Sequence, residues 1–189
     1  MKTARYFALV FSLFVPLGSV WAAPGMQVSV RQAGAQLSVE GWLETRASPE
    51  VAWSVLTDYA RFPEFVPGIQ FNRVVSATGH TKTIEQRGEV VTGMFRMRYD
   101  GTMRVDESPE TGLTVLFLSG PFKDVRGEWR IEPAGKQQPA RLVYQLDMDM
   151  MKSPFPPPLA PGIAEQQVRV WVETFAREME SRMERRKAK

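Results

Sequence analysis

The sequence predicts an α+β domain in which a seven-stranded antiparallel sheet wraps around one long C-terminal helix, with two short helices after the first strand. Two patterns predict this fold. Between residues 37 and 150, apolar and polar side chains alternate in successive segments, as they do in half-buried strands. Residues 162–189 instead carry apolar residues three, four and seven positions apart, which is typical of an amphipathic helix. Each element has one apolar face, so packing the sheet against the helix buries both.

The N-terminal segment has the pattern of a secretory signal peptide. Lys2 and Arg5 give a positive start, residues 7–15 are apolar, and Val20 and Ala22 occupy the third and first positions before the expected cleavage point. The apolar run is shorter than the ~20 residues that span a bilayer, which disfavours a membrane anchor. We therefore predict that residues 1–22 are a signal peptide, cleaved after Ala22, and that the protein is exported to the periplasm.

Charge and composition exclude some functions. The 24 Lys and Arg residues are nearly balanced by 21 Asp and Glu residues once Lys2 and Arg5 are removed, so no nucleic-acid partner is expected. Residues 182–189 form a basic tail, which suits the negative end of a helix dipole and leaves open a transient membrane contact. The chain has no cysteine, so burial alone must stabilise an exported domain.

Residues 37–45 form the first predicted strand, with the apolar face on the odd positions and Trp42 as the exception. Ser48-Pro49-Glu50 then provides a capping hydroxyl, a first-position proline and an early acid, which together predict a helix start. A second short helical turn over residues 59–65 is expected to end before Pro67-Gly68.

Six further strands are predicted in series, and the short loops between them favour an antiparallel meander. The fourth strand of the seven alternates without error from Phe95 to Val105. Five prolines within residues 153–161 predict a stiff connection to the last helix. The six strands are expected at residues 69–75, 84–90, 95–105, 113–118, 125–132 and 141–150.

Three short motifs carry a family resemblance: Pro49-Glu50-Val51-Ala52-Trp53 with Leu56-Thr57-Asp58-Tyr59, then Phe62-Pro63-Glu64-Phe65-Val66-Pro67-Gly68, and Gly120-Pro121-Phe122-Lys123 with Gly127-Glu128-Trp129. Together with the element order, they resemble the START-like (Bet v 1-like) helix-grip superfamily, in particular its polyketide cyclase/dehydrase and coenzyme Q-binding branch. The resemblance implies a helix-grip fold with a START-like ligand-binding domain over residues 36–187, preceded by an N-terminal lead over residues 23–35.

A curved sheet and a helix do not close-pack everywhere, and the gap between them can form a mostly apolar pocket. The resemblance likewise implies a central cavity for a hydrophobic small molecule or lipid, such as an isoprenoid, quinone or fatty-acyl species. Its entrance is expected between residues 62–68, residues 120–123 and the start of the last helix. The same side chains could instead fill a solid core, and the pattern alone does not decide between these. The candidate cavity residues are Phe65, Phe95, Met97, Tyr99, Phe117, Phe122, Trp129, Tyr144, Met148, Met150, Val168, Trp171 and Phe175.

The sequence predicts no catalytic residue, no metal site and no cofactor. The only histidine, His80, falls in a predicted turn, and there is no cysteine nucleophile. Asp147 and Asp149 are expected on the solvent face of a strand rather than around a cation.

Two other functions remain open at this point. A polyketide cyclase or dehydratase could use Tyr99, Tyr144, Gln86 or Arg73 to orient or protonate a substrate. An interaction module could use the proline-rich segment and the basic tail on a partner or a membrane surface.

Overall fold

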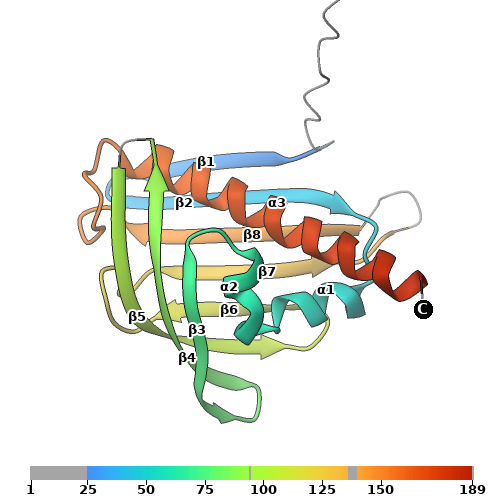
Figure 1. Ribbon diagram of the computed structural model, residues 1–189. Coiled ribbons are helices and arrows are strands. Elements are labelled where there is room, and N and C mark those ends of the chain that lie inside the picture. The colour runs from blue at the N-terminus through green and yellow to red at the C-terminus, as the bar shows by residue number, and fades with distance from the viewer. Residues whose placement is uncertain (1–24, 94, 136–139, 189) are drawn as a thin grey trace, which may run out of the picture.

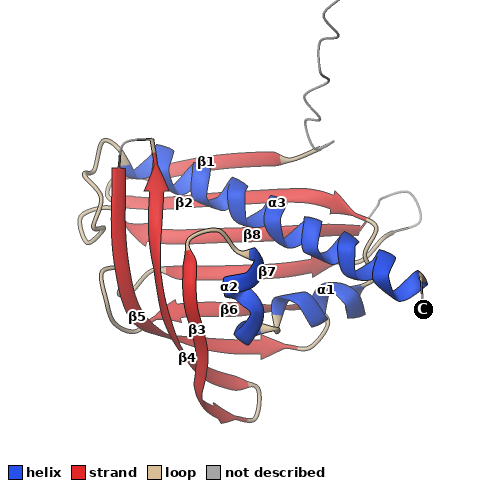
Figure 2. Ribbon diagram, viewed as in Figure 1, coloured by secondary structure: helices blue, strands red, loops and turns tan. Residues whose placement is uncertain are grey.

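The computed structural model describes residues 25–93, 95–135 and 140–188, so the predicted signal peptide lies outside the described residues. The predicted α+β architecture is confirmed: one antiparallel sheet curves around a long helix, α3 (Ala160–Lys187). All helices lie on one side of the sheet, and α3 crosses its concave face obliquely (Figure 1, Figure 2). None of the helices in the described ranges is long and apolar enough to cross a membrane.

The sheet has eight strands rather than the predicted seven, in the order β1-β2-β8-β7-β6-β5-β4-β3. The additional strand is β1 (Gln27–Ala33), which lies in the predicted lead and pairs with β2 from Gln27↔Trp42 to Ala33↔Gln36. Most of β1 is exposed, so it has almost no apolar face and gives a weak strand signal. The remaining strands are β2 (Gln36–Thr45), β3 (Ile69–Thr78), β4 (Thr81–Thr92), β5 (Phe95–Ser108), β6 (Gly112–Phe117), β7 (Arg126–Glu132) and β8 (Ala140–Asp149).

The two short helices after β2 are present as predicted. Ser48 caps α1 (Pro49–Leu56), its hydroxyl accepting a hydrogen bond from the Val51 N–H at 3.3 Å. The second is a 3-10 turn, η1 (Tyr59–Arg61), that continues into α2 (Phe62–Phe65). Helix α1 lies beneath the C-terminal half of α3 (Figure 1), and Phe62 and Phe65 of α2 pack against Phe175 of α3.

Helix α3 begins at Ala160, two residues before the predicted start at Gly162. Pro161 fits there because the first N–H groups of a helix have no intrahelical acceptor. The helix lies directly against β1, β2 and β8. On the side facing β4–β7, larger side chains such as Trp171 and Phe175 extend from the helix towards the sheet.

The contact between α3 and β2 depends on Gly41. A Cβ atom at Gly41 would lie 2.6 Å from Cγ1 of Val168 and 3.6 Å from Cγ2 of Val172, both fully buried. The helix therefore approaches this strand more closely than any residue with a side chain would permit. This contact fixes the height of α3 above the sheet.

Replacing Gly41 with alanine should lower the free energy of unfolding by about 1–3 kcal/mol, since Val168 is branched and cannot move aside without shifting the helix. Urea denaturation of the chain lacking residues 1–22 measures this. The matched control is Gly162→Ala in α3, where an added Cβ meets no atom within 4 Å. It should leave stability unchanged or raise it by up to about 1 kcal/mol. Equal effects at the two glycines would contradict the close approach.

Candidate functional site

Two small cavities lie between α3 and the sheet. The first, cavity A, has a volume of about 50 Å³ and an almost entirely apolar lining. It lies under the N-terminal half of α3, where Tyr99, Phe117 and Phe122 of the sheet side face Ile163 and Ala164 of the helix. The described residues that line it are Val90, Tyr99, Phe117, Phe122, Val125, Leu146, Met148, Phe155, Ile163, Ala164, Gln167 and Trp171.

The second, cavity B, has a volume of about 60 Å³ and lies closer to α2. Three of its aromatic rings pack one against the next. The ring centroids of Tyr144 and Trp129 are 4.4 Å apart, and those of Trp129 and Phe175 are 4.7 Å apart. Its lining, within the part of the chain that the structure describes, is Phe62, Val66, Ile69, Gln86, Met103, Val115, Phe117, Trp129, Tyr144, Trp171 and Phe175.

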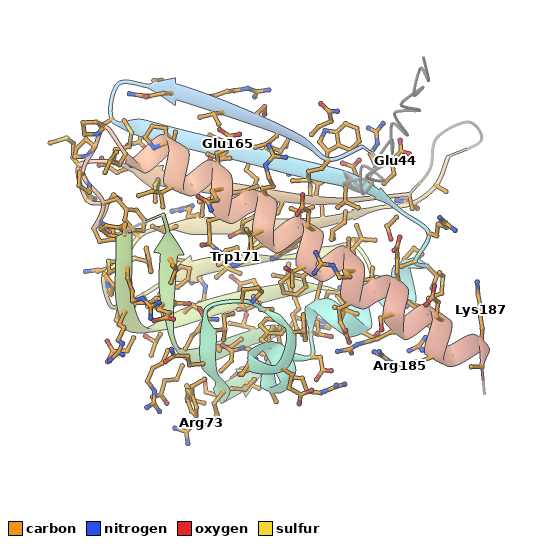
Figure 3. The ribbon with its side chains drawn as sticks, turned by 45° about the horizontal axis from the view of Figure 1, so that its top comes forward. Glu44, Arg73, Glu165, Trp171, Arg185 and Lys187 are labelled. Atoms are coloured by element: carbon orange, nitrogen blue, oxygen red, sulfur yellow. The ribbon has the colours of Figure 1, made fainter. Side chains whose placement is uncertain are left out.

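Phe117 of β6 and Trp171 of α3 line both cavities and so form the partition between them. Figure 3 places Trp171 midway along α3. Its ring packs edge-to-face against Tyr144, with centroids 5.4 Å apart. A change in the position of the indole would therefore alter both cavities.

Eight of the thirteen candidate cavity residues line cavity A or cavity B. They come from β5, β6, β7, β8, the turn after β6, and α3, because the inward positions of those strands face the helix. These eight are Tyr99, Phe117, Phe122, Trp129, Tyr144, Met148, Trp171 and Phe175.

The other five candidates pack elsewhere in the core. Phe65 lies edge-to-face on Phe175 at 5.5 Å, and Phe95 on Phe155 at 5.4 Å. Val168 is fully buried over Gly41. Met97 and Met150 are half-buried and buried, respectively, within the same core.

Several lining residues were not among the candidates. Phe155 comes from the proline-rich connection, whose composition indicates a linker rather than a buried ring. Val90, Met103 and Leu146 lie on inward strand positions, so the alternation contains a signal for them. The other lining residues that were not among the candidates are Phe62, Val66, Ile69, Gln86, Val115, Val125, Ile163, Ala164 and Gln167.

A buried chain of hydrogen bonds runs along the sheet beside the cavities. The Tyr99 hydroxyl donates to Oε1 of Gln86 at 3.0 Å, and Nε2 of Gln86 donates to Oδ1 of Asn72 at 3.0 Å. Nδ2 of Asn72 then donates to the backbone carbonyl of Tyr59 at 2.8 Å. Gln86 and Asn72 are only 5% and 6% exposed, so these bonds satisfy amides that would otherwise be costly to bury.

The two tyrosines of the cavities are held neutral. Burial raises the pKa of Tyr99, and burial, with the nearby Asp147 carboxylate, raises the pKa of Tyr144. A phenol with a raised pKa can donate a hydrogen bond but is a poor general base near neutral pH. The site therefore offers hydrogen bonds rather than proton abstraction.

The indole N–H of Trp171 is buried and has no hydrogen-bond acceptor among the described residues. Leaving such a donor unsatisfied costs roughly 1–3 kcal/mol. The partition between the cavities is therefore held in a conformation that lacks one favourable interaction.

An outer groove of about 190 Å³ adjoins cavity A between β4, the Pro67-Gly68 turn and the first half of α3. Val90, Ile163 and Gln167 line both spaces. The groove occupies part of the entrance region expected from the sequence. Among the described residues, the groove is lined by Pro67, Gly68, Glu89, Val90, Val91, Ile163, Gln166, Gln167 and Val170.

The other residues considered for chemistry lie away from the cavities. His80 is exposed in the turn between β3 and β4. Arg73 is paired with Glu85 at 2.9 Å and points away from the body of the molecule (Figure 3). Within the described residues, no group of three or more His, Asp or Glu side chains could hold a metal ion.

Comparisons with known proteins bear on this arrangement. A family model described as polyketide cyclase / dehydrase and lipid transport matches residues 45–176. A search of curated proteins finds no significant match.

Solved structures with the same architecture include a START superfamily protein from Mycobacterium smegmatis, with a TM-score of 0.65 and 18% identity over 76% of this chain and 97% of that one. A STAR-related lipid transfer protein from Xanthomonas axonopodis has a TM-score of 0.63 and 15% identity over 84% and 95%. An aromatase/cyclase from a Streptomyces species has a TM-score of 0.63 and 17% identity over 78% and 96%. At these identities the likeness establishes the helix-grip fold alone.

The tyrosines allow a test of this interior in solution. Removing residues 1–22 leaves three of the four tyrosines, Tyr59, Tyr99 and Tyr144. Burial is the largest cause of a raised pKa at each. The folded chain should thus keep its phenol protons above about pH 10, where the unfolded chain loses them, and stability should fall as pH rises through that range.

Near-ultraviolet absorbance during alkaline titration measures phenolate formation. We expect a cooperative rise that coincides with loss of circular dichroism, whereas the chain in urea should titrate gradually near its ordinary pKa. Gradual titration of all three tyrosines in the folded protein would contradict the packing described for the cavities.

Proposed function

The chain belongs to the polyketide cyclase/dehydrase and lipid transport family, and from this premise we propose that it binds a hydrophobic small molecule or lipid between α3 and the sheet. The observation that carries the proposal is the pair of apolar cavities, separated by the side chains of Phe117 and Trp171. Isoprenoids, quinones and fatty-acyl species have the apolar surface that such a lining would bury.

Both cavities are small. At roughly 24 cal/mol per Å³, an empty cavity of about 50 or 60 Å³ costs about 1 kcal/mol, which a folded domain tolerates. A ligand of lipid size needs more room than either cavity provides. Binding therefore requires Trp171 or neighbouring flexible side chains such as Met148 to move, and the ligand then supplies the contacts that the cavities lack.

A cyclase or dehydratase is the second candidate function. It is favoured by the hydrogen bond between Tyr99 and Gln86 at the boundary of the two cavities, because a neutral phenol can orient or protonate a carbonyl. An enzyme of this kind would return a chemically altered molecule, whereas a binding protein would return its ligand unchanged.

Export is part of the proposed function, and it is supported by the pattern of residues 1–22. The expected outcome is a mature protein that begins at Ala23 in the periplasm. Intact-mass measurement of the protein from the periplasmic fraction tests this. A cytoplasmic protein that retains its first 22 residues would contradict it.

Native mass spectrometry of the gently purified mature protein, followed by organic extraction, tests ligand binding. We expect an apolar molecule at near-stoichiometric amounts. Trp171→Ala should change its retention several-fold, since the indole lines both cavities, whereas His80→Ala in the exposed turn should leave retention unchanged.

Deletion of residues 185–189 provides a second control, because a ligand held in the interior does not need the basic tail. Equal effects of Trp171→Ala and His80→Ala would contradict the location of the site. Loss of ligand on deletion of the tail alone would favour a surface interaction instead.

A further inference from the structure

We propose that the ligand is a neutral amphiphile whose hydroxyl or carbonyl end lies beside Gln167, where cavity A meets the outer groove. The inference rests on the proposed binding function and narrows its ligand class. It is carried by the position of Gln167 and by the absence of basic side chains from the described linings.

Gln167 is the polar residue at the boundary between the interior and the surface. Of the three residues that line both cavity A and the outer groove, Val90 and Ile163 are apolar and Gln167 is an amide. Cavity A has two other polar groups: the Tyr99 hydroxyl, which already donates to Gln86, and the Trp171 indole N–H, which lies at the partition with cavity B rather than beside the groove. An amphiphile with its tail in cavity A would thus place its polar end against the Gln167 amide.

The charges around this position disfavour an anionic end. Among the described residues that line the two cavities and the groove, there is no Lys, Arg or His. The charged residue there is Glu89, whose carboxylate is paired with Arg96 at 3.3 Å. A fatty-acid carboxylate or a phosphate would enter beside an existing carboxylate, with which the Arg96 guanidinium is already paired.

A neutral polar end avoids the cost of bringing a negative charge into this environment. Moving a carboxylate out of water without a counter-charge is far more costly than moving a hydroxyl or carbonyl that keeps one hydrogen bond. The side-chain amide of Gln167 can donate to a carbonyl and can accept from a hydroxyl. Alcohols, esters and ketones are therefore all compatible, whereas acids are not.

The groove has a fixed backbone edge that would position this end. The Glu89 N–H donates to the Gly68 carbonyl at 2.7 Å, which ties the turn after α2 to β4. Gly68 has a φ of +86°, and a Cβ there would lie 2.4 Å from the Glu89 carbonyl. The turn therefore lies too close to β4 for a side chain, and a backbone hydrogen bond holds it against that strand.

Isothermal titration calorimetry of the mature protein with decan-1-ol and with decanoate tests the proposal. At about pH 8 the acid is ionised, so the two probes share a tail and differ in charge. Decan-1-ol should bind at least about tenfold more tightly. Decylamine, which carries a positive charge on the same tail, is the third probe. If decanoate bound as tightly as decan-1-ol or more tightly, or if decylamine bound more tightly than decan-1-ol, the inference would be overturned and the proposed function would stand. Binding of none of the three would count against the proposed function itself.

Two substitutions test the position of the polar end. Gln167→Lys should reverse the preference towards decanoate, because it adds the missing positive charge at the boundary. The matched control is Gln32→Lys on β1, at the opposite edge of the sheet, which adds the same charge and should keep the preference for decan-1-ol.

Gln167→Leu serves if the lysine variant does not fold, and it should weaken decan-1-ol about fivefold by removing its hydrogen bond. If both folded variants keep wild-type affinities, the polar end does not lie at Gln167.

Discussion

The close contact between α3 and β2 at Gly41 is the constraint on which the rest of the interior depends. Because Val168 and Val172 reach the strand backbone there, the helix lies directly against β1, β2 and β8. The sheet continues to curve away through β7, β6, β5 and β4 (Figure 1). Its far strands are therefore reached by long side chains such as Trp171 and Phe175 rather than by the helix itself. Aromatic rings span this widening gap but do not fill it, and the two cavities are what remains.

The two halves of α3 are held in different ways. Near its C-terminal end, the Arg182 guanidinium pairs with Asp58 and Glu178 at 2.8 Å each and donates to the Ser54 carbonyl at 3.1 Å. The ion pair with Asp58 and the hydrogen bond to Ser54 fix the helix to α1 and its following turn, while Glu178, on α3 itself, orients the guanidinium. The N-terminal half lies over cavity A through apolar side chains such as Ile163, whose contacts are less directional. Adjustment to a ligand is therefore easier at the end of the helix that adjoins the groove.

Most of the fold follows from period and parity in the sequence. The alternation of β5 and the helical stripe of α3 are strong because both elements bury one face. Strand β1 gives little signal because its valines are mostly exposed and its pairing depends on β2. The cavity linings are harder to predict for a different reason: alternation tells which residues point inward, but not which of them meet a neighbour. Val168 and Trp171 are both on the inner side of α3, yet one packs on Gly41 and the other borders the cavities. Only the position of the helix on the sheet decides which of the two residues meets a neighbour and which borders a cavity.

The partition formed by Phe117 and Trp171 has a consequence for how affinity depends on ligand length. In a uniform pocket, each added methylene group contributes a similar increment, about 0.8 kcal/mol. Here this gain per methylene group would apply only until the ligand tail fills cavity A and meets the Trp171 indole. The next carbon must displace the ring from its packing against Tyr144 before it gains further contacts. A homologous series would thus bind in two regimes joined by a discontinuity, and the interior would sort molecules by length as well as by polarity.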